Sequence, residues 1–184
     1  MPRDTLIDFF GDLSQARGEF LAYDDGFRSR GYSYAEVARA ARGLAARLHA
    51  LGVRKGDKIV FWSENRPEWV VAFWACLLRG IIVVPIDYRA SPDFLARVVS
   101  IVSARLILIG QEVAPFTAPA GVPVWKLHEF DWRTEAAADP PAVAITRDDI
   151  AEIIFTSGAT AEPMASSSPT ATSWRTSSRS STRS

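Results

Sequence analysis

Gly80-Ile81-Ile82-Val83-Val84 is the stretch of sequence that decides the fold class. Its four consecutive β-branched residues leave no polar face, which is typical of a strand buried on both sides, as the inner strands of parallel sheets are. Gly80 allows the backbone to change direction at the start of the run. The stretch therefore predicts an inner strand of a parallel sheet.

Helices and strands alternate on both sides of this stretch. Upstream, the short apolar run 59–62 predicts a strand, and Pro67 begins a helix that extends to about Arg79. Downstream, residues 91–103 predict another helix and residues 106–109 another buried strand. This order predicts parallel strands joined by right-handed crossovers, and hence an α/β fold with helices flanking a parallel sheet.

Two helix starts carry capping signals. The stretch Ser33-Tyr34-Ala35-Glu36 has the spacing of a capping box, and Gly52 predicts the end of that helix. Before the helix that begins at Pro67, we interpret Asn65, with its neighbours Glu64 and Arg66, as a cap rather than as a substrate contact.

Composition excludes several classes of protein. Lys+Arg and Asp+Glu number 21 each, so no excess of positive charge indicates a nucleic-acid partner. The single cysteine, Cys76, lies in an apolar run and is expected to be a buried thiol. No apolar stretch reaches the roughly 20 residues of a transmembrane helix, and the N-terminus lacks a secretory apolar region, so a cytoplasmic protein is expected.

Other residues that could carry chemistry have simpler interpretations. His49 is expected to face solvent and His128 to be a surface or packing residue, because neither has a second ligand at metal-binding spacing. The aromatic group is expected to be core rather than an acyl channel, and it consists of Trp62, Trp69, Phe73 and Trp74.

The chain is predicted to divide into three parts. Residues 1–145 are predicted to form an N-terminal α/β subdomain, because an acidic, Ala- and Pro-rich connection ends there. Residues 146–163 are predicted to hold the first strand of the next subdomain, within 148–155, and a loop after it. Residues 164–184 are predicted to be a non-native tail.

The loop that follows this strand has the composition of a phosphate cradle. It reads Thr156-Ser157-Gly158-Ala159-Thr160-Ala161-Glu162-Pro163. Glycine permits close backbone approach, exposed amides bind phosphate oxygens, and small hydroxyl groups donate further hydrogen bonds. A plain Ser/Thr/Gly loop is the alternative that composition leaves open. The Walker pattern is excluded because its Gly-Lys-Ser/Thr ending is missing.

The order of residues in this loop resembles the phosphate loop of adenylate-forming (AMP-binding) enzymes of the acyl-CoA synthetase type. Thr156, Ser157, Gly158, Thr160 and Pro163 match that pattern. Sequence landmarks similar to those of the family occur upstream of the loop in the family's order, at residues 32–36, 52–57, 64–69 and 80–85. The resemblance spans roughly residues 7 to 163.

The sequence departs from the family pattern at four positions. Ala159 and Ala161 stand where the family often has Ser/Thr and Gly, and Met164-Ala165 stands in place of Lys-Gly, which removes a positive charge that would meet the phosphates. Residues 165–184 contain nine Ser, four Thr and three Arg, so disorder is expected.

Our hypothesis for the origin of this tail is a frameshift at Met164. Codons can be chosen for residues 164–179 whose alternative frame reads Gly-Val-Val-Ile-Thr-His-Arg-Asn-Ile-Leu, as the family continues, although an additional substitution or sequence error is also needed. The chain is then expected to be truncated and inactive. A natural low-complexity tail is the other interpretation, and the codons of the gene distinguish the two.

The resemblance implies an ATP-dependent ligase. A carboxylic acid would react with ATP to give an acyl-adenylate, and a thiol, commonly that of coenzyme A but alternatively that of a carrier protein, would then displace AMP, with Mg²⁺ offsetting the phosphate charge. Thr156, Ser157, Gly158 and Thr160 would hold phosphate oxygens, and none would be a catalytic acid or base. The acid stays open, although the resemblance favours a hydrophobic acid, as in fatty acid metabolism. Alternatives of another class are a non-catalytic interaction fragment and a pseudogene product.

Overall fold

A mostly parallel sheet lies at the centre of the structure, a computed structural model that describes residues 5–130, 141–155 and 170–173. Its strands are β3 (Lys58–Trp62), β4 (Ile82–Ile86), β5 (Leu106–Ile109), β6 (Val124–Lys126), β7 (Ile150–Ile154) and β8 (Thr170–Ser173). They follow the spatial order β6-β5-β3-β4-β7-β8. All neighbours in this order pair in parallel except β7 and β8, which are antiparallel.

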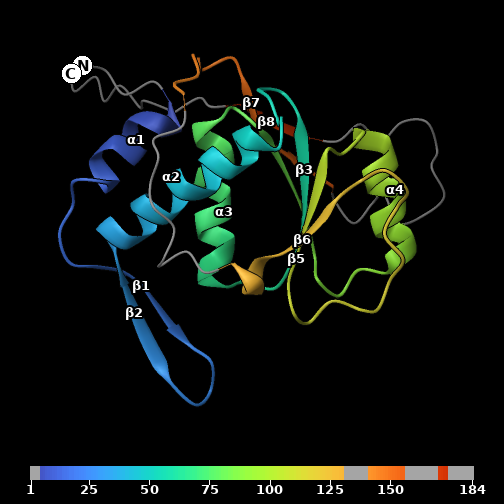
Figure 1. Ribbon diagram of the computed structural model, residues 1–184, viewed down its shortest axis with the longest axis horizontal. Coiled ribbons are helices and arrows are strands. Elements are labelled where there is room, and N and C mark those ends of the chain that lie inside the picture. The colour runs from blue at the N-terminus through green and yellow to red at the C-terminus, as the bar shows by residue number, and fades with distance from the viewer. Residues whose placement is uncertain (1–4, 131–140, 156–169, 174–184) are drawn as a thin grey trace, which may run out of the picture.

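Helices cover both faces of the sheet (Figure 1). Helix α3 (Pro67–Leu78) connects β3 to β4, and α4 (Pro92–Val102) connects β4 to β5 on the opposite face. Helix α2 (Tyr34–Ala50) packs beside α3, and α1 (Leu6–Leu13) contacts both. The predicted α/β fold with a parallel sheet and flanking helices is therefore confirmed.

Alternate residues of the central strands point to opposite faces of the sheet. On β3, Ile59 and Phe61 pack in the core under α2 and α3, whereas Val60 and Trp62 pack in the core under α4, and all four are fully buried. On β4, Val83 packs in the core under α2 and α3, and Val84 packs in the core under α4. Because both faces are covered, these strands have no polar side, as the sequence predicted.

The start of α2 has the predicted capping box. Ser33 Oγ accepts from the Glu36 amide at 3.3 Å, while Glu36 Oε2 accepts from the Ser33 amide at 2.8 Å. At the other end, Gly52 has φ +81°, a left-handed conformation that glycine adopts without strain. Both boundaries of this helix are therefore fixed by local sequence, as predicted.

A two-stranded antiparallel hairpin precedes α2 and extends away from the helices and sheet (Figure 1). It consists of β1 (Glu19–Asp24) and β2 (Ser29–Ser33), and at its tip the Phe27 side chain is 96% exposed. The sequence patterns predicted neither this hairpin nor α1. A short 3-10 helix, η1 (Leu127–Glu129), follows β6 and was also not predicted.

Strand β7 lies beside β4, with Glu152 opposite Val83. The sheet thus continues across residue 145, while the division into subdomains at that residue stays a prediction. Strand β8 lies within the stretch predicted to be disordered.

Candidate functional site

The carboxyl ends of three neighbouring strands meet at one edge of the sheet. Trp62, the last residue of β3, lies opposite Ile86 of β4 and Ile109 of β5. The strands are parallel, so the segments that follow them begin side by side. In open α/β sheets, ligands bind at this edge.

The chain reverses its direction along the sheet after β4. From β3 the chain passes by α3 to β4 on one side, and from β4 it returns by α4 to β5 on the other side. The segment after β3 enters α3 on one face, whereas Val113 and Phe116, after β5, pack on the face of α4. The crevice between the carboxyl ends of β3 and β5 is therefore the topological switch point, where open sheets commonly bind their ligand.

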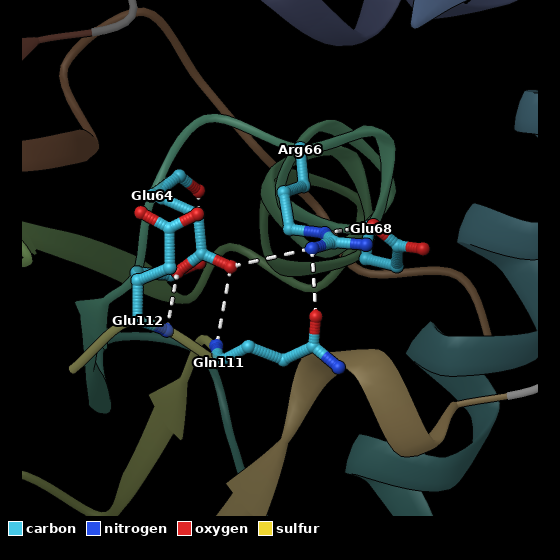
Figure 2. Close-up of polar contacts among 6 residues, drawn as sticks. Glu64, Arg66, Glu68, Gln111 and Glu112 are labelled. Carbon is cyan, nitrogen blue, oxygen red and sulfur yellow. Dashed lines mark hydrogen bonds and ion pairs between the residues drawn. The ribbon is translucent and has the colours of Figure 1, made fainter. Parts of the chain in front are cut away.

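A side chain of the protein occupies this crevice. Glu64 follows β3 and is 8% exposed, and its Oε1 accepts from the Gln111 amide at 3.1 Å. Its Oε2 accepts from the Glu112 amide at 3.4 Å. Figure 2 shows the carboxylate of Glu64 pointing at the backbone of the segment after β5. Two backbone amides that converge on one carboxylate form an anion site of the kind that protein loops offer to phosphate.

Glycine at position 110 leaves room for this carboxylate. A Cβ atom on Gly110 would clash with Glu64 Oε2 and would lie 2.7 Å from Glu64 Cδ and 2.8 Å from Ser63 Oγ. The glycine at position 110 therefore allows the Glu64 side chain to approach the backbone closely, and it is not needed for a left-handed turn.

An arginine completes the surroundings of Glu64. Arg66 Nη1 donates to Gln111 Oε1 at 2.8 Å and lies 3.7 Å from Glu64 Oε1. Arg66 Nε lies 3.5 Å from Glu68 Oε2, so the guanidinium bridges two carboxylates and the side chain of Gln111 (Figure 2). The cluster links the segment after β3 to the segment after β5, 45 residues apart in sequence.

A polar hollow of about 340 Å³ opens beside Glu64, between the ends of β3 and β4. Its polar lining includes Asn65, Asp87 and Arg89. The side-chain and backbone hydrogen bonds from Arg89 lower the pKa of Asp87 to about 2, so this carboxyl is ionised at neutral pH. The Asp87 and Arg89 charges offset each other, and the hollow has no large excess of either sign.

A second hollow, of about 320 Å³, lies between the hairpin and the start of α3. Its lining is mainly apolar and includes Leu21, Tyr23, Pro67 and Trp69. The Arg66 guanidinium lies 5.4 Å from the centre of the Tyr23 ring, a cation–π distance. Arg66 therefore connects this hollow to the cluster around Glu64.

The four predicted phosphate-binding residues, Thr156, Ser157, Gly158 and Thr160, lie outside the described residues. The described stretch that precedes this loop ends at Phe155. The ring of Phe155 contacts Phe94 of α4 edge to face, with centroids 6.4 Å apart. The described part of the candidate site is therefore the part formed by the residues after β3, β4 and β5.

Asn65 does not cap α3, so that prediction is wrong. The helix has Arg66 at its N-cap position and no side-chain cap hydrogen bond. Asn65 is exposed and lines both hollows, while the carboxylate of its neighbour Glu64 turns away from the helix to the segment after β5. The longer Glu64 side chain reaches amides that only tertiary structure brings near.

The histidines and the cysteine behave as expected. His49 is exposed, and its Nδ1 lies 3.1 Å from Arg79 Nη2. His128 is half-buried, which fits a packing residue. Cys76 is fully buried, and burial raises the pKa of its thiol. No group of three or more potential ligands (His, Cys, Asp or Glu) that could hold a metal ion occurs among the described residues.

The aromatic group packs as core, as predicted, with one addition. Trp62 is fully buried, and Phe73 and Trp74 pack against the core. Trp69 stacks on Phe73, with centroids 5.5 Å apart and planes inclined by 11°, yet it also lines both hollows. Its ring therefore belongs to the core on one side and to the candidate site on the other.

Sequence reasoning missed the pairing of Glu64 with Gly110 and the amides after it. The single local signal was a glycine directly after a buried strand. Which acidic side chain would meet it depends on the strand order, which places β3 next to β5.

A sequence profile of the AMP-binding enzyme family matches residues 13–165 of the chain. A feruloyl-CoA synthase from Amycolatopsis sp. is 30% identical over 137 residues, covering 71% of this chain and 27% of that protein. A long-chain-fatty-acid–CoA ligase from Mycobacterium tuberculosis, FadD13, is 29% identical over 141 residues, covering 71% of this chain and 28% of that protein. The chain thus spans little more than a quarter of the length of these relatives.

A solved structure shares the fold. The fatty acyl-adenylate ligase from Legionella pneumophila, solved in complex with acyl adenylate and pyrophosphate, superposes with a TM-score of 0.74 and 20% identity. The match covers 92% of this chain and 30% of that one. In the described part of the chain, no helix has the length and apolarity to cross a membrane.

Proposed function

The chain belongs to the AMP-binding enzyme family, which its match over residues 13–165 shows, and on this premise we propose that it carries the ATP phosphate loop of an acyl-CoA synthetase-like ligase. In the reaction, a carboxylate oxygen attacks the α-phosphorus of ATP. The bond to pyrophosphate breaks and an acyl-adenylate forms. A thiolate, that of coenzyme A, then attacks the acyl carbon and displaces AMP.

The position of β7 is the observation that carries this proposal. β7 is parallel to β4 and ends at Ile154, at the carboxyl edge of the sheet. Ligands of open α/β sheets bind outside this edge. A loop of glycine and small hydroxyl residues that follows such a strand can offer its amides to phosphate oxygens.

Thr156, Ser157, Gly158 and Thr160 act by holding phosphate oxygens. Their hydrogen bonds strengthen as negative charge shifts toward the leaving pyrophosphate, which lowers the barrier without proton transfer to the protein. Mg²⁺ would accompany the phosphates and offset their charge. The missing Lys-Gly at 164–165 removes a cation from this environment, so phosphate binding by this chain is expected to be weak.

The acid and the acceptor belong to the same proposal. The relatives named above are a feruloyl-CoA synthase and a long-chain-fatty-acid–CoA ligase, so the activated group is proposed to be a hydrophobic carboxylic acid, with coenzyme A as the acceptor. The apolar hollow between the hairpin and α3 is not needed for this assignment. A cytoplasmic location follows from the use of ATP and coenzyme A and is proposed with them.

Nucleotide binding by the purified 184-residue chain tests the phosphate loop. Isothermal titration calorimetry with MgATP and with magnesium pyrophosphate is expected to show weak, saturable binding. The variant Thr156→Val/Ser157→Ala/Thr160→Val is expected to bind at least about tenfold more weakly, because each lost hydrogen bond to a charged oxygen contributes more than 1 kcal/mol. A matched control, Ser177→Ala/Ser178→Ala/Thr182→Val, is expected to bind like the parent chain. Equal binding by both variants, or no binding by the parent, overturns the proposal.

We also propose that the chain by itself is inactive and that its reading frame changes at Met164. Release of pyrophosphate from ATP in the presence of a panel of acids is expected to stay at the level of a blank. Codons in the gene that forbid the alternative frame after residue 163 would contradict the second part. Pyrophosphate release above the blank would contradict the first.

A further inference from the structure

We infer that the Glu64 carboxylate occupies an anion-binding site at the topological switch point and thereby prevents nucleotide phosphates from binding in this crevice. This inference rests on the proposed ATP-dependent function. The ligand class of the site is a carboxylate or another small oxyanion. The nucleotide then has to bind further along the edge, toward β4 and β7.

The site is built from groups that favour an anion. The Gln111 and Glu112 amides point at the two oxygens of Glu64, at 3.1 and 3.4 Å. The Arg66 guanidinium adds a positive charge 3.7 Å from Oε1 and is itself held by Gln111 Oε1. Backbone amides and a guanidinium are the donors that phosphate-binding crevices use.

The Glu64 carboxylate fills the space of the crevice and also accepts the hydrogen bonds of its two amides. Glu64 is 8% exposed, and its Oε2 and Cδ lie where a side chain at position 110 would begin. Only a glycine allows this approach, so the crevice is fitted to the carboxylate group. A phosphate group could reach the two amides only by displacing Glu64 from a nearly buried position.

The crevice would therefore bind a free oxyanion once the side chain is removed. Glu64→Ala deletes the Cγ and the carboxyl group, which together have the composition of acetate. Acetate can then occupy the vacated space and accept from the same two amides. A side chain that only filled volume would not be replaced by an anion in this way.

Chemical rescue tests the inference. The melting temperatures of the parent chain, Glu64→Ala, Glu64→Gln and the control Glu112→Ala are measured in sodium chloride, acetate, formate and phosphate at equal ionic strength. We expect Glu64→Ala to melt about 5 °C lower in chloride, because a partly buried anion site is left empty. Acetate and formate are expected to restore a substantial part of that loss in Glu64→Ala alone. Glu112→Ala keeps its amide and is expected to behave like the parent chain.

Two results overturn the inference. One is an equal effect of acetate on all four chains, and the other is a Glu64→Ala chain as stable as the parent. If Glu64→Ala does not fold, Glu64→Gln answers the question, because glutamine keeps the volume of the side chain and removes its charge, and it is therefore expected to lower the melting temperature as the loss of a charge-assisted hydrogen bond does. A Glu64→Gln chain that melts like the parent chain counts against an anion site.

Titration of the parent chain with MgATP tests the second half of the inference. In amide-resolved NMR spectra, the Gln111 and Glu112 amides are expected to keep their chemical shifts. Saturable shifts of these two amides show that the crevice is open and overturn the inference. If no amide of the chain responds to MgATP, the proposed function fails, while acetate rescue still decides whether Glu64 occupies an anion site.

Discussion

Lys55 Nζ lies 2.7 Å from Asp149 Oδ2, and this ion pair joins the turn before β3 to the turn before β7. Lys55 also donates to the Ala144 carbonyl at 2.8 Å. Its stem lies across Gly80, where an added Cβ would be 2.9 Å from Lys55 Cγ. One side chain therefore fastens the segment that leads into β7, and through β7 the approach to the proposed phosphate loop.

Removal of the Lys55 charge is expected to loosen β7. Lys55→Met keeps most of the stem and loses the ion pair and the hydrogen bond to Ala144, so we expect a loss of about 1 kcal/mol in the free energy of unfolding, measured by urea titration. Lys126→Met is the matched control, because its pair with Glu129 is more exposed and spans three residues. A larger loss for Lys126→Met than for Lys55→Met would contradict the assignment.

The Lys55–Asp149 ion pair is expected to make the stability of the chain depend on pH. The hydrogen bond from Lys55 and that from the Thr146 amide hold the pKa of Asp149 below its ordinary value of 3.8. A carboxyl with a depressed folded-state pKa contributes stability above its unfolded pKa, and this contribution is lost as the pH falls below that value toward the folded one. The stability difference between the parent chain and Lys55→Met is therefore expected to be constant from pH 7 to 5 and to shrink below about pH 4. A difference that grows on acidification would exclude this mechanism.

The sequence was sufficient for the elements whose periodicity and boundaries are local. Helix α2 begins at a capping box and ends before Gly52, and β4 is an unbroken apolar run, so both were predicted near their observed bounds. The hairpin of β1 and β2 was missed because its residues are mostly exposed and carry no apolar period. Strand β6 has three residues, too few for a pattern.

The candidate site was less predictable than the fold for a physical reason. Glu64 and Gly110 meet only because β3 and β5 are neighbours, and neither the spacing nor the type of these residues indicates that contact. Local reasoning assigned the acid and the asparagine after β3 to a helix start, since this was the partner within reach along the chain. The hydrogen-bond partners of Glu64 are instead the backbone amides that follow β5.

Gly110→Ala is expected to destabilise the chain through the carboxylate of Glu64. The new methyl group occupies the space of that carboxylate, and the backbone there is tied to Trp62 by a hydrogen bond of 3.0 Å. Overpacking of this kind costs about 1 to 3 kcal/mol, or a decrease of several degrees in melting temperature for a chain of this size. The double variant Gly110→Ala/Glu64→Ala is expected to recover part of the loss. Strict additivity of the two changes would show that the methyl group clashes with something else.

Glu152→Gln is expected to stabilise the chain at neutral pH. Glu152 is half-buried on β7, and burial raises its pKa above the ordinary value of 4.5. A carboxyl with a raised folded-state pKa favours folding while it is protonated, and the penalty develops as the pH rises from its unfolded pKa through the folded one. The gain in melting temperature from Glu152→Gln should be present at pH 7 and fall toward zero at about pH 4. A gain that is independent of pH would assign the effect to packing.

Ser33→Ala is expected to cost about 1 kcal/mol, the usual contribution of an N-cap. Ser33 Oγ accepts from the Glu36 amide, and Glu36 Oε2 accepts from both the amide and the hydroxyl group of Ser33, each at 2.8 Å. Urea unfolding of Ser33→Ala and Ser33→Thr separates the cap from other effects, because threonine keeps the hydroxyl group and is expected to retain most of the stability. Equal losses in both variants would show that the hydroxyl group is not the stabilising group.

Cys76 makes the stability of the core measurable without any substitution. It is the sole cysteine of the chain, it is fully buried on α3, and burial raises the pKa of its thiol, so the reactive thiolate is scarce in the folded state. An aromatic disulfide reagent at pH 8 is therefore expected to label the native chain only as fast as α3 opens, whereas the chain in 6 M urea should be labelled within seconds. Ser33→Ala, which weakens the neighbouring α2, should accelerate labelling by up to about fivefold if α2 and α3 open together, since 1 kcal/mol corresponds to that factor. Rapid labelling of the native parent chain would contradict the buried position of α3 against the sheet.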